Sequence, residues 1–591
     1  MTDRGRAALV AVASVVGAFV LYAGALGHPF IGDDQLAVRG NPTVARPSVT
    51  GLRALWVTDY WRGVAPDGLV TEMSTDRNLY RPVTIASFWL TSWFAGIDAT
   101  PFRVGNVLLH ALAATLIGML CVALGWRRGG PVAVVFVLVH PVATDVVNRI
   151  VGRADVLAVI GVLAFVLVQR HARDGGWTAM RALAAFVAAC VAFGAKESGV
   201  VLVPLALFAG WIFGPAARVP GRADRGRWLG AVALVAAAAL YLIGREVAVD
   251  LPTYAPTTTW DLGGNPVWGT SLAVRLPVAL ALAAHYARLV LFPTTLIAFD
   301  VPPVVPNWGD LETWIGALVL AALGAGLVVA AWRRHPVSVG VAWWLLSFLI
   351  VSQFFVPIGA YREVRFAYVL VAAGALTIGW LFERVSARAG WARAAGLVVV
   401  LGAVAFAIPT VWQRNADFRD LRTLLEADVR QRPASPAALI RLANIHDQAR
   451  RDAEAEAAFV RVIELAPMSA QVRYELADFH SRRGRTDRAR ELHAQAVGLN
   501  PQHYLSLLAL GNIALSQKDI ATAESWLTRA AEVAPDDPWV IYTLAVLDDN
   551  RGQRARAVQS LTALVERRPD FRSAVSALEH IRADEARKAR R

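Results

Sequence analysis

The first apolar stretch, residues 7–26, reads AALVAVASVVGAFVLYAGAL and follows Arg4 and Arg6. Twenty such residues form a helix about 30 Å long, which matches the hydrocarbon thickness of a membrane. Basic residues before a first span favour a cytoplasmic N-terminus. Because the run is long for a signal peptide and many spans follow, we expect it to remain as an anchor. The alternative is cleavage after the Ala23-Gly24-Ala25 sequence.

Ten further apolar runs extend the pattern through residue 412. They cover residues 103–124, 131–147, 153–169, 182–195, 199–213, 228–244, 312–332, 336–356, 364–382 and 394–411. If all eleven runs alternate across the membrane, the inner segments hold 16 Arg in 52 residues. Of the 21 acidic residues in this part, 17 fall on the outer side. The positive-inside rule therefore favours this threading, which puts the C-terminal part outside.

Two apolar stretches are not expected to cross. Residues 83–96 are too few, and residues 272–293 include His285, Tyr286 and Arg288. We interpret both as interfacial helices on the outer surface. If 272–293 did cross, the topology after it would invert and the C-terminal part would be cytoplasmic.

The composition supports a membrane protein with a second, polar part. The chain has 591 residues, 56% hydrophobic and 18% charged, with a mean hydropathy of +0.44. Residues 1–412 carry 31 Lys+Arg and 21 Asp+Glu, whereas residues 413–591 carry 28 and 25. The net charge of +13 therefore lies mostly in membrane loops and indicates no nucleic-acid partner. Only Cys121 and Cys190 are present, so a disulfide framework is excluded.

The polar part, residues 413–591, contains a 34-residue repeat. Five prolines mark it: Pro433, Pro467, Pro501, Pro535 and Pro569. This is the period of tetratricopeptide (TPR) repeats, in which paired helices stack into a solenoid. We expect four full repeats over about 436–569, and an all-α fold for the whole chain. The positions that are usually bulky and aromatic hold His446, His480, Ala514 and Asp548 instead.

Polar residues gather at four span mouths on the expected outer face. The first place is Asp33-Asp34 in the outer loop 27–102, where paired carboxylates can provide a general base. The second follows His140 and includes Asp145, Asn148, Arg149, Arg153 and Asp155. A solvated loop and snorkelling side chains are the alternatives to a site at these two places.

The third place is Lys196-Glu197, which includes the one lysine among residues 1–412. The fourth is the segment from Tyr361 to Tyr368, in which Arg362 and Arg365 suit phosphate oxygens. A buried structural pair and an interfacial anchor are the respective alternatives. No Gly-rich phosphate loop, HExxH, zinc spacing or GxSxG occurs in a supporting context, which disfavours ATP-driven transport and zinc proteolysis.

These places, in this order and with a TPR array behind them, resemble the transmembrane-and-TPR (TMTC) proteins and their bacterial relatives. The matching residues are Phe30, Asp33-Asp34, Asn41-Pro42, Tyr80-Arg81-Pro82, Asn106, His110, His140-Pro141, Asp145, Gly152 to Asp155 and Lys196-Glu197. The resemblance covers most of residues 20–210 and the repeats. It implies a membrane glycosyltransferase of the GT-C type, in which residues 83–96 are the juxtamembrane helix. Such enzymes move a sugar, typically mannose, from a polyprenyl-phosphate carrier to a protein hydroxyl.

By this similarity the outer-loop Asp pair supplies the base, and Asp33 aligns with the leading Asp of the family. Two departures from the family pattern concern the phosphate-binding and acidic positions. Relatives tend to have Glu-Arg and an aromatic residue where this chain has Glu363-Val364-Arg365, and often Glu in place of Asp145 or Asp155.

We therefore predict an inverting transferase with a membrane domain, residues 1–412, and a TPR domain, residues 413–591. The catalytic candidates are Asp33 and Asp34, and the donor phosphate candidates are Lys196, Arg153, Arg365 and Arg362. The supporting polar network consists of His140, Asp145, Asp155, Glu197, Arg81 and His110.

The predicted partners are a polyprenyl-phosphate-linked sugar, an acceptor polypeptide held by the TPR domain, and membrane lipid. The predicted location is a bacterial inner membrane, with the TPR domain periplasmic or extracellular. A divalent cation is neither required nor excluded. Two alternatives remain open: a non-enzymatic TPR scaffold for envelope assembly, and a glycosyltransferase with a non-protein acceptor.

Overall fold

In the computed structural model, the regular elements of the described residues are helices joined by loops. The described residues are 3–61, 79–214, 228–249, 265–267, 269–301, 305–388, 390–568 and 571–589. Within them the extended pairing is limited to one isolated antiparallel bridge between Asp300 and Arg362. The predicted all-α class is confirmed for these ranges. Part of the outer loop (62–78) and the repeat proline Pro569 lie outside them.

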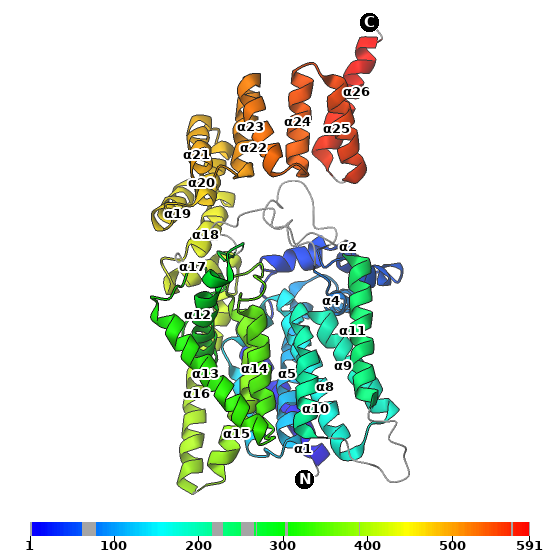
Figure 1. The fold of residues 1–591 in the computed structure, drawn as a ribbon, viewed down its shortest axis with the longest axis vertical. Coiled ribbons are helices and arrows are strands. Elements are labelled where there is room, and N and C mark those ends of the chain that lie inside the picture. The colour runs from blue at the N-terminus through cyan, green and yellow to red at the C-terminus, as the bar shows by residue number, and fades with distance from the viewer. Residues whose placement is uncertain are drawn as a thin grey trace.

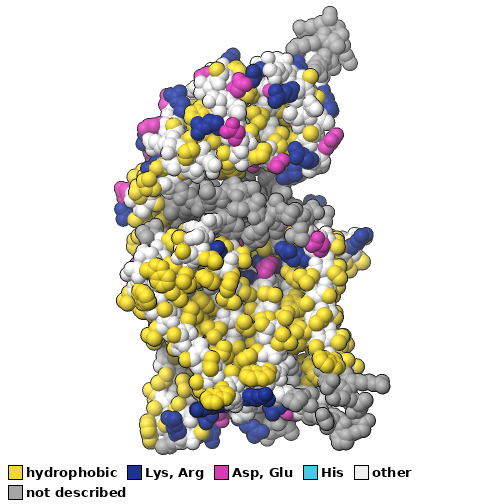
Figure 2. Space-filling model, in the orientation of Figure 1, with side chains coloured by type: hydrophobic (Ala, Val, Ile, Leu, Met, Phe, Trp, Pro, Cys, Tyr) yellow, Lys and Arg dark blue, Asp and Glu magenta, His cyan; other side chains and the backbone are white. Residues whose placement is uncertain are grey.

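Each of the eleven predicted apolar runs contains a helix. The helices are α1 (Asp3–Tyr22), α5 (Ala99–Ala123), α6 (Gly129–Val139), α8 (Arg153–Gly175), α9 (Ala179–Ala195), α10 (Leu202–Phe213), α11 (Leu229–Ala248), α13 (Leu311–Trp332), α14 (Val337–Val351), α15 (Ala367–Ser386) and α16 (Gly390–Asp417). Seven of them are long and apolar enough to cross a membrane, and α6, α9, α10 and α14 are shorter apolar helices. On the face turned to the viewer, Figure 2 shows a broad belt of hydrophobic side chains over this bundle, with Lys and Arg along its lower edge. The chain is a multi-pass membrane protein.

The predicted run 131–147 is broken in the structure. Helix α6 ends at Val139, and Pro141 follows, which has no N–H to continue a helix. The chain then forms the short helix α7 (Ala143–Asn148) and a 3-10 turn over Ile150–Gly152 before α8 begins. This break places Asp145 and Arg149 on a buried turn instead of a continuous span.

Helix α12 (Leu272–Leu291), predicted to be interfacial, is long and apolar enough to be an eighth candidate span. Its flanks both contact the end of the bundle that carries the repeats. Before it, Asn265 donates to Gln353 and to the Ile358 carbonyl, in the loop between α14 and α15. After it, the Leu296 amide donates to Gln431 of the repeat array. A helix that starts and finishes beside the same end of the bundle fits the interfacial interpretation, which stays a prediction.

The outer loop contains the helix expected at residues 83–96. Helix α4 spans Pro82–Ala95 and begins with proline, whose fixed φ suits the first turn of a helix. Its Thr84 hydroxyl donates to the Ala195 carbonyl at the end of α9. This contact holds α4 across the mouth of the bundle, next to Lys196 and Glu197.

The C-terminal array has the predicted paired helices. The pairs are α18 (Pro436–Gln448) with α19 (Asp452–Leu465), α20 (Ala470–Arg482) with α21 (Thr486–Leu499), α22 (Tyr504–Ser516) with α23 (Ile520–Val533), and α24 (Pro538–Asn550) with α25 (Arg554–Arg567). Helix α17 (Leu421–Gln431) precedes them and α26 (Arg572–Ala589) follows. The repeat position with His446, His480, Ala514 and Asp548 is buried in all four pairs. Figure 1 places the array at the end of the bundle opposite the N-terminus.

Small residues let the membrane helices approach closely. A Cβ at Gly161 of α8 would lie 2.4 Å from the Ala192 amide nitrogen and 2.7 Å from the Ala188 carbonyl oxygen of α9. Both neighbours are backbone atoms, which cannot turn away as a flexible side chain would. The contact between α8 and α9 therefore requires glycine at position 161.

We predict that Gly161→Ala separates α8 from α9 and lowers the free energy of unfolding by about 1–3 kcal/mol, the usual effect of overpacking. Thermal unfolding of the purified protein in detergent measures the change. Gly402→Ala in α16 is the matched control, because nothing lies within 4 Å of the added Cβ. Equal unfolding temperatures for Gly161→Ala and wild type would contradict this packing.

Candidate functional site

The two outer-loop aspartates occupy different environments. Asp34 is fully buried, and its carboxylate accepts hydrogen bonds from the backbone amides of Val151 (3.0 Å) and Ile31 (3.3 Å). Burial raises the pKa of Asp34 to about 6, although these hydrogen bonds oppose the shift. Asp34 therefore ties the outer loop to the turn before α8.

Asp33 is half-buried, and within the described ranges no residue hydrogen-bonds or ion-pairs with its carboxylate. Its negative charge acts on Arg149, Arg365 and the Tyr60 hydroxyl, which belong to three other segments of the chain. Of the two neighbouring carboxylates, Asp33 is the one that a substrate can approach.

Four acid–base pairs gather beside Asp33. They are Arg149 Nε with Asp145 Oδ1 at 3.2 Å, Lys196 Nζ with Asp155 Oδ1 at 2.6 Å, Arg81 Nη2 with Glu197 Oε2 at 2.7 Å, and Arg365 with Glu363. The negative charges of Asp33, Asp145, Asp155 and Glu363 all act on Arg365, which shows that the pairs share one cluster. The structure thus brings together predicted residues from five separate segments.

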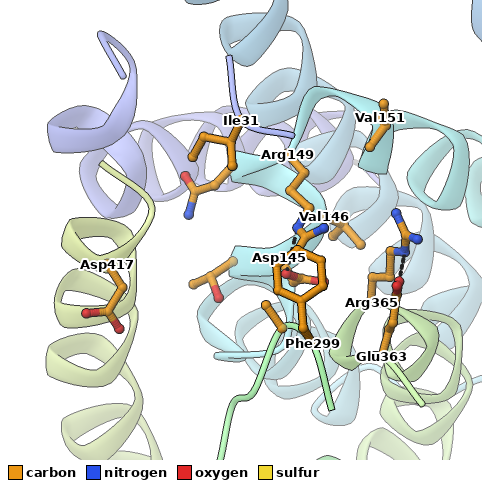
Figure 3. A network of polar contacts seen from close by, with 12 residues as sticks. Ile31, Asp145, Val146, Arg149, Val151, Phe299, Glu363, Arg365 and Asp417 are labelled. Carbon is orange, nitrogen blue, oxygen red and sulfur yellow. Dashed lines mark ion pairs between the residues drawn. The ribbon is translucent and has the colours of Figure 1, made fainter. Parts of the chain in front are cut away.

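Two of these pairs leave polar atoms without hydrogen bonds. Figure 3 shows Asp145 facing Arg149 and Glu363 facing Arg365, with Phe299 beside Arg149. Both pairs have poor hydrogen-bond geometry: buried Arg149 Nε and Nη2, both Asp145 oxygens and Arg365 Nε have no hydrogen-bond partner in the described structure. Unsatisfied donors in a buried charged cluster can serve a bound anion.

Arg153, predicted to bind the donor phosphate, lies in the interior. Its Nε donates to Asn106 Oδ1, Nη1 donates to Thr91 and to the Ser87 carbonyl, and Nη2 donates to the Phe102 carbonyl. All three nitrogens are engaged, so Arg153 fastens α4 and α5 to α8. The spacing of residues in the sequence does not indicate that groups on α4 and α5 accept the hydrogen bonds of Arg153.

Three other predicted residues also lie outside the cluster. Arg362 pairs with Asp300, with Nε 2.9 Å from Oδ2. His110 contacts the Tyr368 hydroxyl at 2.9 Å, and His140 Nε2 lies 3.1 Å from the Val290 carbonyl oxygen. Both histidines lie inside the helix bundle and cross-link helices there. No three His, Cys, Asp or Glu side chains in the described ranges are grouped closely enough to hold a metal ion.

Three residues that shape this place were not among the predicted site residues. Arg103 donates to the carbonyls of Leu26, His28, Pro29 and Asn148, which fixes the start of the outer loop. The buried Tyr60 ring lies 5.2 Å from the Arg81 guanidinium, and the Phe299 ring lies 4.8 Å from that of Arg149. Arg103 could have been noticed as a charge within an apolar run. The two aromatic residues have no local sequence signal.

The comparisons with known proteins confirm the resemblance to TMTC proteins. Mouse protein O-mannosyl-transferase TMTC1 is 35% identical over 179 residues, which cover 30% of this chain and 18% of the mouse protein. Mouse protein O-mannosyl-transferase TMTC3 is 22% identical over 627 residues, which cover 93% of this chain and 66% of the mouse protein. The chain thus matches about a fifth of TMTC1 and less than two thirds of TMTC3.

Two further similarities concern the array and the fold. Residues 439–560 match the family described as the cilia and flagella-associated protein 70 middle TPR-like domain, in agreement with the predicted repeats. The crystal structure of ArnT from Cupriavidus metallidurans bound to undecaprenyl phosphate is 14% identical, with a TM-score of 0.37. That similarity covers 76% of this chain and 81% of ArnT.

Asp34 gives a prediction for the pH dependence of stability. Its folded-state pKa, about 6, lies above the ordinary value, so the folded state holds the proton more tightly than the unfolded state. The resulting stabilisation, up to about 3 kcal/mol, is complete below pH 4 and lost as pH rises through 6. We expect the gain in unfolding temperature between pH 7 and pH 5 to be smaller in Asp34→Asn than in wild type. An identical gain in both proteins would show that Asp34 does not titrate in this range.

Proposed function

We propose that the chain is a GT-C-type membrane glycosyltransferase that moves a sugar, typically mannose, from a polyprenyl phosphate to a polypeptide Ser or Thr hydroxyl. The observation that carries this proposal is Asp33, an approachable carboxylate beside a cluster of arginines and a lysine. The similarity to O-mannosyl-transferases over most of the chain supports the reaction class. A membrane anchor for a scaffold has no need for such a cluster.

In the proposed reaction Asp33 acts as the general base. Its carboxylate accepts the proton of the acceptor hydroxyl while the hydroxyl oxygen attacks the anomeric carbon of the sugar. The bond from that carbon to the carrier phosphate breaks, and its electron pair stays on the phosphate oxygen. In-line attack opposite the leaving phosphate inverts the anomeric centre. Asp34 is too deeply buried to reach the acceptor and serves to hold the loop.

The leaving phosphate gains negative charge, and cations in the cluster stabilise it. Lys196, Arg365 and Arg149 are the proposed donors, because the charge of Arg365 acts on both Lys196 and Arg149, and the charge of Asp33 acts on both arginines. Arg149 and Arg365 also carry unsatisfied nitrogens that can turn from their carboxylates to phosphate oxygens. Arg153 and Arg362 are left out of this role because groups inside the bundle engage Arg153 and Asp300 engages Arg362.

The proposed organisation is a membrane domain of residues 1–412 that carries out transfer and a TPR domain of residues 413–591 that presents the acceptor. The array lies at the same end of the molecule as α4, as Figure 1 indicates. It also contacts residues 298–299, and Phe299 lies beside Arg149 of the cluster. The proposed setting is a bacterial inner membrane, with this end on the periplasmic or extracellular side. The positive-inside pattern of the loops supports this orientation.

We predict that Asp33→Asn lowers the rate of sugar transfer about 10²- to 10⁴-fold, the usual contribution of a general base. The measurement uses protein reconstituted in lipid vesicles, with radiolabelled polyprenyl-phosphate mannose and a Ser/Thr-rich polypeptide. Asp98→Asn is the matched control, because Asp98 is an exposed carboxylate before α5 and lies outside the cluster. Full activity of Asp33→Asn would remove Asp33 from the mechanism.

The same assay separates the two alternative functions. A scaffold predicts no sugar transfer by the wild type. Its function in envelope assembly would be lost on deletion of residues 413–591 and kept in Asp33→Asn. A transferase with a non-protein acceptor predicts sugar on a lipid or glycan acceptor, and none on the polypeptide.

A further inference from the structure

We propose that the repeat array positions Arg149 within the candidate site, through the segment of residues 296–300. Under this proposal the array completes the site in addition to presenting the acceptor. The inference rests on the proposed function. It adds Phe299 as a positioning residue, which acts on the carrier phosphate through Arg149. The contacts that carry it run from α17 to Asp33 in three steps.

In the first step, α17 holds the segment that follows α12. Asp428 Oδ2 accepts hydrogen bonds from the backbone amides of Ala298 (3.0 Å) and Phe299 (3.1 Å). Gln431 accepts one from the Leu296 amide at 2.8 Å, and Arg432 pairs with Asp300. Asp428 and Gln431 lie on one face of α17, and Arg432 directly follows its end, so the C-terminal end of this helix holds a single segment.

In the second step, Phe299 of this segment contacts arginines from both parts of the chain. The guanidinium carbon of Arg149 lies 4.8 Å from the ring centroid, and that of Arg441 in α18 lies 4.6 Å away. Phe418, at the end of α16, lies 6.0 Å from Arg149 as well. A desolvated guanidinium over an aromatic ring is held by electrostatic attraction to the ring face.

In the third step, Arg149 depends on these rings for its orientation. Its pair with Asp145 lacks hydrogen-bond geometry, and its Nε and Nη2 have no hydrogen-bond partner in the described structure. Without directional bonds, the position of the guanidinium is set by packing against Phe299 and by the charges around it. Asp33, Glu363 and Arg365 supply those charges.

The segment also reaches the other side of the cluster. Asp300 pairs with both Arg432 of the array and Arg362, and it forms the backbone bridge to Arg362. Glu363 and Arg365 follow Arg362 directly in the chain. A displacement of α17 would therefore move the supports of Arg149 and Arg365 together, which couples the array to the site.

The test compares two variants of Phe299. Phe299→Leu keeps an apolar side chain but removes the ring, whereas Phe299→Tyr keeps an aromatic ring. We expect Phe299→Leu to lower kcat about 3- to 30-fold, the range for one cation–π contact, with the acceptor KM unchanged. Phe299→Tyr should retain the wild-type kcat. Unchanged kcat in Phe299→Leu, or a rise in acceptor KM alone, would overturn the proposal, because the array would then act only in acceptor capture.

A second measurement does not depend on activity. Hydrogen exchange of the full-length protein in detergent is compared between wild type and Asp428→Asn, in peptides covering residues 143–152. The proposal predicts faster exchange there, although the substitution lies in the array. Glu464→Gln, an exposed position on α19, is the control and should change nothing. Unaltered exchange in Asp428→Asn would refute the coupling, whereas absence of sugar transfer by wild type would refute only the proposed function.

Discussion

The buried carboxylate of Asp34 is the contact on which the arrangement of the polar cluster depends. It joins the Ile31 amide in the outer loop to the Val151 amide in the turn before α8. Because a buried carboxylate is costly without such donors, the loop and the turn must meet in one register. That register sets Asp33, one residue earlier, towards Arg149 and Arg365. Asp34 thus acts on the site through the backbone, and Asp33 acts through its side chain.

The second constraint is the break at Pro141. A continuous helix over residues 131–147 would carry Asp145 along the bundle, whereas the break folds α7 and the following turn beneath the outer loop. Arg149 then pairs with Asp145 and meets Phe299 from a distant segment. A buried ion pair is stable only when hydrogen bonds to its polar atoms offset the cost of desolvating both charges. Arg149 Nε and Nη2 and both Asp145 oxygens have no such hydrogen bonds in the described structure. Such incomplete pairing is typical of a place that exchanges partners with a charged ligand.

Much of the fold could be predicted from periodic features of the sequence. Apolar runs of span length locate the helices, and prolines at 34-residue intervals locate the paired helices of the array. Acids and bases at span mouths also anticipate the gathering of Asp33, Asp145, Asp155, Lys196 and Arg365, since successive span ends on one side must share one face. The direction of each side chain could not be predicted in this way. Arg153, His110 and His140 were predicted from the same span mouths, yet their partners lie inside the bundle, and Arg362 pairs with Asp300 outside the cluster.

The roles of the adjacent residues Asp33 and Asp34 could not be separated by sequence either. Asp34 is buried against Val151, more than a hundred residues later, whereas Asp33 has no such contact in the part of the chain that the structure describes. The contacts of Phe299 with Arg149 and of Asp428 with residues 298–299 join segments equally far apart. No local pattern encodes such pairings, because they arise only when the helices have packed.

The most direct measurement of the central claim is glycopeptide mass spectrometry of envelope proteins from cells that express wild type or Asp33→Asn at matched levels. The proposed function predicts hexose-sized mass additions on Ser or Thr residues in cells with wild type, and their loss in cells with Asp33→Asn. Identical glycopeptides in both strains would contradict a role for Asp33 as the base of a protein glycosyltransferase.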